Sequence, residues 1–240
     1  MNFSNIILNW YAINGRELPW RQTTDPYAIW LSEVIMQQTK IAQGTAYWER
    51  FIKRWPNVQS LANATEDEVL REWQGLGYYS RARNLHKAAQ QIIDLGYFPQ
   101  TYNELIQLKG IGEYIAAAVY SIAFAGPVAV VDGNVYRVLA RFFGIETPID
   151  STQGKKIFKA IAQDNLPKNA PAAYNQGIMD FGAMQCTPTL PNCKVCPLIE
   201  YCFAANNNKV SSLPVKIKKT KQRERHFSYI YILSLIHISE

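Results

Sequence analysis

The sequence has few features of a membrane, secreted or disordered protein. No apolar run reaches the roughly 20 residues that span a bilayer, and residues 1–12 lack the basic stretch that opens a secretory signal. Charged residues make up 18% of the chain and hydrophobic residues 48%, a balance typical of folded globular proteins. We therefore expect a cytoplasmic protein with no membrane partner, and 240 residues suffice for one large domain or two small ones.

Net positive charge is concentrated in one segment. Residues 209–225 carry seven Lys/Arg against one acid, Glu224, and this segment accounts for the net charge of +6. The preceding part of the chain is close to neutral. Any grip on nucleic acid would therefore rely on local patches and backbone amides rather than on overall charge.

No convincing alternating strand pattern occurs before Phe227, so we expect an all-α fold. Capping boxes at Thr65–Glu68 and Thr101–Glu104 predict helices that end near Trp73 and Leu108. Similar start and stop signals predict further helices at 26–38, up to Leu95 before Gly96, 113–125, 133–143, 152–164 and 171–185.

The segment 108–137 organises the rest of the chain. Its turn, Lys109-Gly110-Ile111-Gly112, separates two expected helices. Both glycines can take positive φ and let a large partner approach the backbone. The helix that follows would present free N–H groups, which suit an anion such as phosphate.

Two carboxyl groups are candidate catalytic residues. Glu33 is the only charged residue of the helix expected at 26–38, and its apolar neighbours should raise its pKa and make it a proton donor. Asp132 opens the helix expected at 133–143, where the helix dipole favours its ionised form. Two plainer alternatives stay open here: Glu33 could reach the surface, and Asp132 could be only an N-cap.

A glycine-rich turn, Gly75–Gly77, precedes Tyr78 and Tyr79 and two arginines, Arg81 and Arg83. The tyrosines could be core residues. They could equally form an aromatic wedge with neighbouring phosphate contacts, as in proteins that extrude a base from the duplex.

All four cysteines lie within seventeen residues, and only one pair has the C-x-x-C spacing. A structural zinc site usually shows two such pairs. An all-cysteine iron–sulfur cluster therefore fits better than zinc, and a disulfide pair fits least. The four candidate ligands are Cys186, Cys193, Cys196 and Cys202.

The composition changes after residue 205. Residues 206–225 are expected to form a basic connector, and 226–240 the start of a truncated C-terminal domain, because one strand-like run cannot be a domain. The last residues, 235–240, resemble translated sequencing adapter.

Taken together, these motifs resemble the helix-hairpin-helix DNA glycosylase superfamily, and within it the adenine DNA glycosylases that act on adenine opposite 8-oxoguanine. The resemblance covers residues 1 to about 225. It rests on Leu-Pro-Trp20-Arg21, Ser-Glu33-Val-Ile-Met-Gln-Gln38-Thr, Gly-Leu-Gly-Tyr78-Tyr-Ser, the hairpin, Val-Asp132-Gly-Asn134-Val and the four-cysteine loop.

The resemblance implies a catalytic domain at 1–205 with two lobes. One lobe would be a six-helix barrel of about 22–128. The other would join 1–21 to 129–205 and carry a [4Fe–4S] cluster on the four cysteines. The partner would be double-stranded DNA with A:8-oxoguanine or A:G mismatches, bound by a monomer, with the target base flipped into the cleft between the lobes.

The resemblance also implies residue roles. Glu33 would protonate N7 of adenine, and Asp132 would stabilise the oxocarbenium sugar, which agrees with environments that push the two pKa values apart. The other implied site residues are Asn134 and Tyr114 as catalytic assistants; Trp20, Arg21 and Gln176 in the adenine pocket; Gln38 and Tyr78 around the opposing base; and Lys109, Gly110, Ile111 and Gly112 at the DNA backbone.

One position departs from relatives that resemble endonuclease III, which also cut the strand. Those relatives have a lysine two residues after the last hairpin glycine, and here that residue is Tyr114. Without an amine there, Schiff-base strand cleavage is not expected. The alternatives are a pyrimidine-lesion glycosylase and lyase of the same fold, and a non-catalytic iron–sulfur DNA-binding module.

Overall fold

A computed structural model of the chain describes residues 2–217 and 226–227, and within them it is helical with no strand. The connector beyond residue 217 and the strand-like run after Phe227 lie outside the described residues. The α-helices are α1 (Phe3–Asn14), α2 (Pro26–Ile35), α3 (Ile41–Arg54), α4 (Val58–Ala62), α5 (Glu66–Glu72), α6 (Ser80–Leu95), α7 (Tyr102–Leu105), α8 (Glu113–Phe124), α9 (Gly133–Phe143), α10 (Thr152–Asp164), α11 (Pro171–Asp180) and α12 (Phe203–Asn206).

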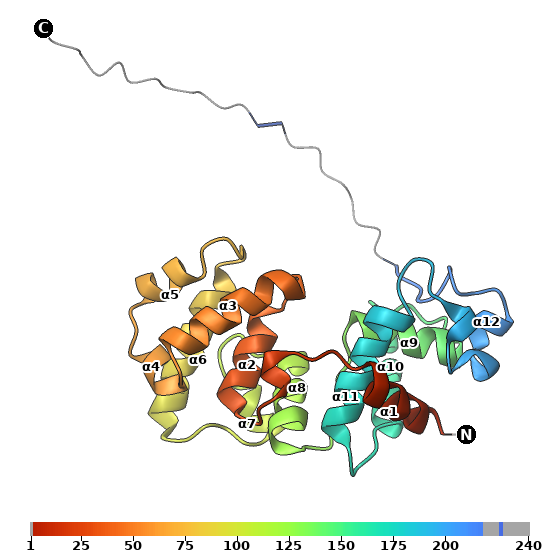
Figure 1. Ribbon diagram of the computed structural model, residues 1–240, viewed down its shortest axis with the longest axis horizontal. Helices are drawn as coiled ribbons and strands as arrows, with labels where there is room; N and C mark the ends of the chain where they lie inside the picture. Colours follow the sequence, from red (N-terminus) through yellow and green to blue (C-terminus); the bar gives the residue numbers. More distant parts are fainter. Residues whose placement is uncertain (1, 218–225, 228–240) are drawn as a thin grey trace, which may run out of the picture.

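The helices form two lobes along the long axis of the molecule, with α2 to α8 on one side and α1 with α9 to α12 on the other (Figure 1). The first lobe is built around fully buried Trp30, Phe51 and Trp73. Edge-to-face packing joins the rings of Phe51 and Trp73, whose centroids are 5.7 Å apart. The second lobe buries Ile7 of α1 together with side chains from α9 to α11.

Helix α8 belongs to both lobes. Ile115 and Val119 lie in the first core, whereas Ala117 and Ala118 lie in the second. Small alanine side chains let α8 pack closely on α2 and on α11 at the same time. The residues at the start of α8 are therefore held between the lobes.

The predicted helix starts at Thr65, Thr101 and Ser151 are confirmed. Thr65 and Glu68 cap each other reciprocally, as do Thr101 and Glu104. The Ser151 hydroxyl accepts the amide hydrogen bond of Gly154 at 2.9 Å, and α10 has the expected bounds.

Two predicted helix ends were wrong. Helix α2 ends at Ile35 rather than at residue 38, and Gln38 adopts a φ of 52°. Helix α7 ends at Leu105 rather than at Leu108, and turns lead to the hairpin. The helix predicted at 171–185 is confirmed, with α11 up to Asp180 and a π-helical turn at Phe181–Gln185. Within the described residues, every helix is too short or too polar to cross a membrane.

Candidate active site

A cleft of about 620 Å³ opens between the two lobes. Helix α2 and the turn before α6 form one wall, and α8 with the start of α9 forms the other. The cleft is lined by Glu33, Met36, Gln37, Gln38, Tyr78, Ser80, Arg81, Tyr114, Val131, Asp132, Gly133 and Tyr136. The two predicted catalytic residues, Glu33 and Asp132, therefore line the same cleft.

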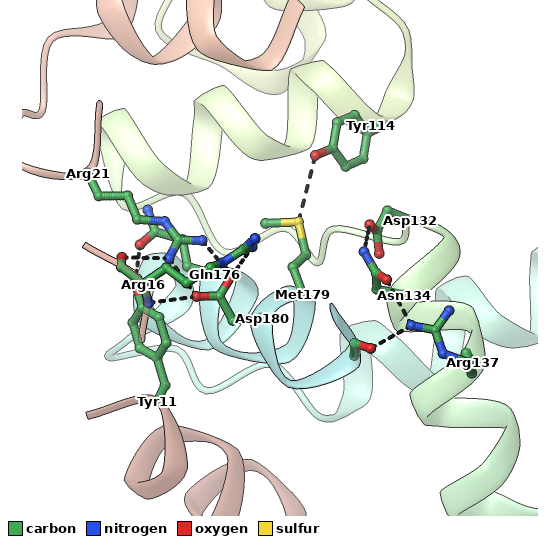
Figure 2. Close-up of polar contacts among 11 residues, drawn as sticks. Tyr11, Arg16, Arg21, Tyr114, Asp132, Asn134, Arg137, Gln176, Met179 and Asp180 are labelled. Carbon is green, nitrogen blue, oxygen red and sulfur yellow. Dashed lines mark hydrogen bonds and ion pairs between the residues drawn. The ribbon is translucent and has the colours of Figure 1, made fainter. Parts of the chain in front are cut away.

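Glu33 projects from α2 toward the start of α8. The Tyr114 hydroxyl donates a hydrogen bond of 2.7 Å to Oε2 of Glu33, and it also lies 3.7 Å from the sulfur of Met179 (Figure 2). Burial raises the pKa of Glu33, while the Tyr114 hydrogen bond and the charge of Arg21 lower it; burial is the largest of these effects. A raised pKa is what a proton donor needs near neutral pH.

Asp132 caps α9, as expected. Its Oδ1 accepts the amide hydrogen bond of Val135 at 2.8 Å, and its Oδ2 accepts one from Nδ2 of Asn134 at 2.8 Å. Burial raises the pKa of Asp132, and these hydrogen bonds oppose the rise. The two carboxyl pKa values are therefore raised together, contrary to the expectation that their environments shift them apart.

Arg137 is a site neighbour that the sequence did not reveal. Its Nη2 donates to Oδ1 of Asn134 at 2.9 Å (Figure 2). Its Nε donates to the carbonyl oxygen of Cys186 at 2.7 Å. The side-chain amide of Asn134, which binds Asp132, is thus itself held by the buried guanidinium of Arg137. Asn134 and Arg137 are three residues apart on α9, and this spacing could have indicated that their side chains are neighbours.

Gln38 and Tyr78 stand at the rim of the cleft on the α2 side. Tyr78 is 66% exposed, so the alternative that it packs in the core is wrong. Of the two arginines beside it, Arg83 pairs with Glu66 at 3.2 Å on the outer surface, and Arg81 turns inward to backbone carbonyls. Arg81 is therefore turned away from solvent, whereas Arg83 stays exposed in its ion pair with Glu66.

Trp20, Arg21 and Gln176 are not among the residues that line this cleft. Trp20 is 7% exposed and packs against the ring of Trp48. Arg21 pairs with the fully buried Asp180 at 2.7 Å, and Gln176 accepts a hydrogen bond from Tyr11 (Figure 2). Their role in an adenine pocket stays a prediction.

The hairpin leads directly into α8. Gly110 has a φ of 78°, and a Cβ there would come within 2.6 Å of Asn84. Gly112 has a φ of −95°, so only the first of the two glycines adopts the positive φ that both can take. No side chain caps the first turn of α8, whose amides follow Gly112.

A second cavity of about 400 Å³ adjoins the cleft and shares Tyr114, Val131 and Tyr136 with it. Its rim carries three lysines of α10 that no motif in the sequence indicated: Lys155, Lys156 and Lys159. Lys159 pairs with Glu113 at 3.3 Å, on the first turn of α8. Positive charge therefore gathers beside the hairpin although the domain is nearly neutral.

The four cysteines line one small pocket together with Arg141, whose Nη1 lies 3.4 Å from Sγ of Cys186. All four are partly buried free thiols. Burial raises the pKa of Cys196 to about 11 and also raises that of Cys202. Within the described residues, no three His, Cys, Asp or Glu side chains are close enough to hold a single metal ion.

Comparison with known proteins agrees with this geometry. The profile of the HhH-GPD superfamily base excision DNA repair protein matches residues 31–164. An adenine DNA glycosylase of Buchnera aphidicola is 38% identical over 96% of this chain, and the human adenine DNA glycosylase is 39% identical over 84%. A solved structure of a thermostable thymine-DNA glycosylase superimposes with a TM-score of 0.79 at 28% identity, covering 85% of this chain and 95% of that one.

The chain spans 67% of the Buchnera protein and 39% of the human one. The matched region contains Glu33, Tyr114 and Asp132, and the hairpin that gives the superfamily its name precedes Tyr114. The chain belongs to the HhH-GPD superfamily of base excision DNA repair proteins.

Proposed function

We propose that this protein is a monofunctional adenine DNA glycosylase, which acts as a monomer on adenine opposite 8-oxoguanine or guanine. The observation that carries the proposal is the pair of carboxyl groups across one cleft, Glu33 bound by Tyr114 and Asp132 bound by Asn134. The names of the relatives support adenine as the base.

The two carboxyls suit hydrolysis of an N-glycosidic bond. A neutral Glu33 gives its proton to N7 of the extruded adenine, and the C1′–N9 bond then breaks with its electron pair going to the base. Ionised Asp132 stabilises the positive charge that develops on the sugar. Water adds its oxygen to C1′ and loses a proton, which leaves an abasic site and free adenine.

The hairpin side of the cleft would hold the DNA backbone. The amides at the start of α8 point out of an uncapped helix N-terminus, which favours a phosphate. The lysines on the rim of the second cavity extend this surface with positive charge. Lys109, Gly110, Ile111 and Gly112 would therefore contact the strand next to the extruded nucleotide.

We propose further that Cys186, Cys193, Cys196 and Cys202 hold a [4Fe–4S] cluster. The four thiols line a single pocket, and a cationic side chain, Arg141, lies against one of them. Both features suit four thiolates around an anionic cluster. The cluster would supply a covalent cross-link for the loop between α11 and α12.

The proposal is tested with duplexes that carry adenine opposite 8-oxoguanine, guanine or thymine, and a fourth with thymine opposite guanine. Adenine release from the first two, with strand breaks only after alkali, is the expected result. Strand breaks without alkali and covalent trapping by borohydride would favour the lyase alternative, although Tyr114 cannot form a Schiff base. Duplex binding without release of any base would favour the non-catalytic module.

A further inference from the structure

Arg81, on the first turn of α6, donates hydrogen bonds to backbone carbonyls at the end of α2. Its Nη1 lies 3.1 Å from the carbonyl oxygen of Val34 and 3.0 Å from that of Ile35. The same nitrogen lies 2.6 Å from the carbonyl oxygen of Gln37. The last carbonyls of a helix have no partner inside the helix. Arg81 therefore supplies donors where α2 stops and the chain turns into the cleft.

The other side of the guanidinium reaches the turn before α6. Nη2 lies 3.3 Å from the carbonyl oxygen of Leu76 and 3.4 Å from that of Gly77. The group also lies over the rings of Trp73 and Tyr78, 5.1 and 5.8 Å from their centroids. One planar cation thus touches two segments that are about forty residues apart in the sequence.

Each of these segments carries one cleft residue with an unusual backbone. Gln38 has a φ of 52° and Tyr78 a φ of 48°, values that are uncommon for residues other than glycine. Such conformations persist where the surroundings hold them. The carbonyls that Arg81 binds at Gln37 and Gly77 belong to the residues immediately before them.

We propose that Arg81 is a positioning residue for base extrusion, which holds Gln38 and Tyr78 at a fixed separation on the rim of the cleft. This inference rests on the proposed function. Separating a base from its partner is a step before the chemistry, and it depends on side chains that enter the stack together. Removal of Arg81 lets the two segments relax independently, whereas the carboxyl groups keep their own hydrogen bonds, Glu33 with Tyr114 and Asp132 with Asn134.

The test compares Arg81→Met and Arg81→Lys with Arg83→Met as the matched control. Arg83 lies two residues further along α6 and pairs with Glu66 on the surface. Single-turnover rates are measured for adenine opposite guanine, and for the same adenine opposite an abasic gap, where no base pair has to be broken. We expect Arg81→Met to lose about tenfold or more on the paired adenine and less than about threefold on the orphan adenine. Lysine cannot reach both segments, so Arg81→Lys should rescue only part of the loss.

Two further measurements separate positioning from folding and from the proposed function. Thermal melting by circular dichroism checks that each variant folds. The fluorescence of 2-aminopurine in place of adenine reports extrusion without cleavage, and it should rise less with Arg81→Met than with Arg83→Met. Equal losses on both substrates, or no loss on either, would overturn the inference. A wild-type protein that releases no adenine would refute the proposed function, whereas the fluorescence comparison would still decide the role of Arg81.

Discussion

At the scale of single residues, the proposed mechanism requires one neutral carboxyl group, Glu33, and one ionised carboxyl group, Asp132. Glu33→Gln and Asp132→Asn are close to isosteric and preserve most of the packing. Loss of the general acid should slow adenine release by about 10²- to 10⁴-fold, and we expect a loss of similar order for Asp132→Asn. Single-turnover excision measures the loss, and a gel shift should show duplex binding nearly unchanged. Near-normal excision by either variant would remove that residue from the mechanism.

Tyr114 allows a prediction about pH. Its hydrogen bond lowers the pKa of Glu33 and so opposes the effect of burial. Tyr114→Phe removes the bond, so the pKa of Glu33 should rise further and the proton should be retained to higher pH. The alkaline limb of the single-turnover rate profile should therefore move to higher pH, with a lower rate at its plateau. A limb that stays in place, or moves to lower pH, would show that another group sets it.

At the scale of elements, the proposed cluster leads to a prediction about the cysteine loop. Cys193→Ser would remove one of the four proposed ligands from a loop that contains only short 3₁₀ turns. We expect little iron and a lower melting temperature, since metal-site ligands and folding are linked. The wild-type protein should contain roughly four irons and absorb broadly near 400 nm. Iron analysis and visible spectra check this, and one zinc per chain without iron would contradict the assignment.

The helices whose starts were predicted correctly are those that local chemistry defines. Thr65, Thr101, Asp132 and Ser151 each accept a hydrogen bond from an amide three residues later. Such a cap involves only neighbours in the sequence, so the pattern of residues is enough to find it. The same local rule predicted Asp132 as the N-cap of α9, whereas its role at the cleft was implied only by the family resemblance.

The features that the sequence did not predict depend on contacts between distant segments. Arg81, on another helix, binds the last carbonyls of α2. Arg21 pairs with buried Asp180, which is far along the chain. No local pattern encodes either partner. Both contacts could therefore be found only in the folded structure.

At the scale of the whole molecule, DNA would cross from the hairpin to α10. Lys155→Gln with Lys156→Gln should weaken duplex binding and reduce the salt dependence of log K by about 0.9 for each DNA phosphate that these lysines neutralise. Titrations from low to moderate salt measure the slope. Lys53→Gln, on α3 and away from both cavities, is the control and should leave the slope unchanged. An unchanged slope for the double variant would place the DNA elsewhere.

The second lobe combines α1, which precedes the first lobe in the sequence, with α9 to α12, which follow it. Helix α1 packs on α11, where Tyr11 donates to Gln176 and the backbone of Arg16 donates to Asp180. A ribosome releases α1 first but makes α11 only after all helices from α2 to α10. At typical rates of translation this interval is on the order of ten seconds. During this interval the first lobe can fold, whereas the helix on which α1 packs has not yet been made. Ile7 therefore stays exposed on the nascent chain. We expect a ribosome-bound chaperone to shield α1 until the last helices emerge.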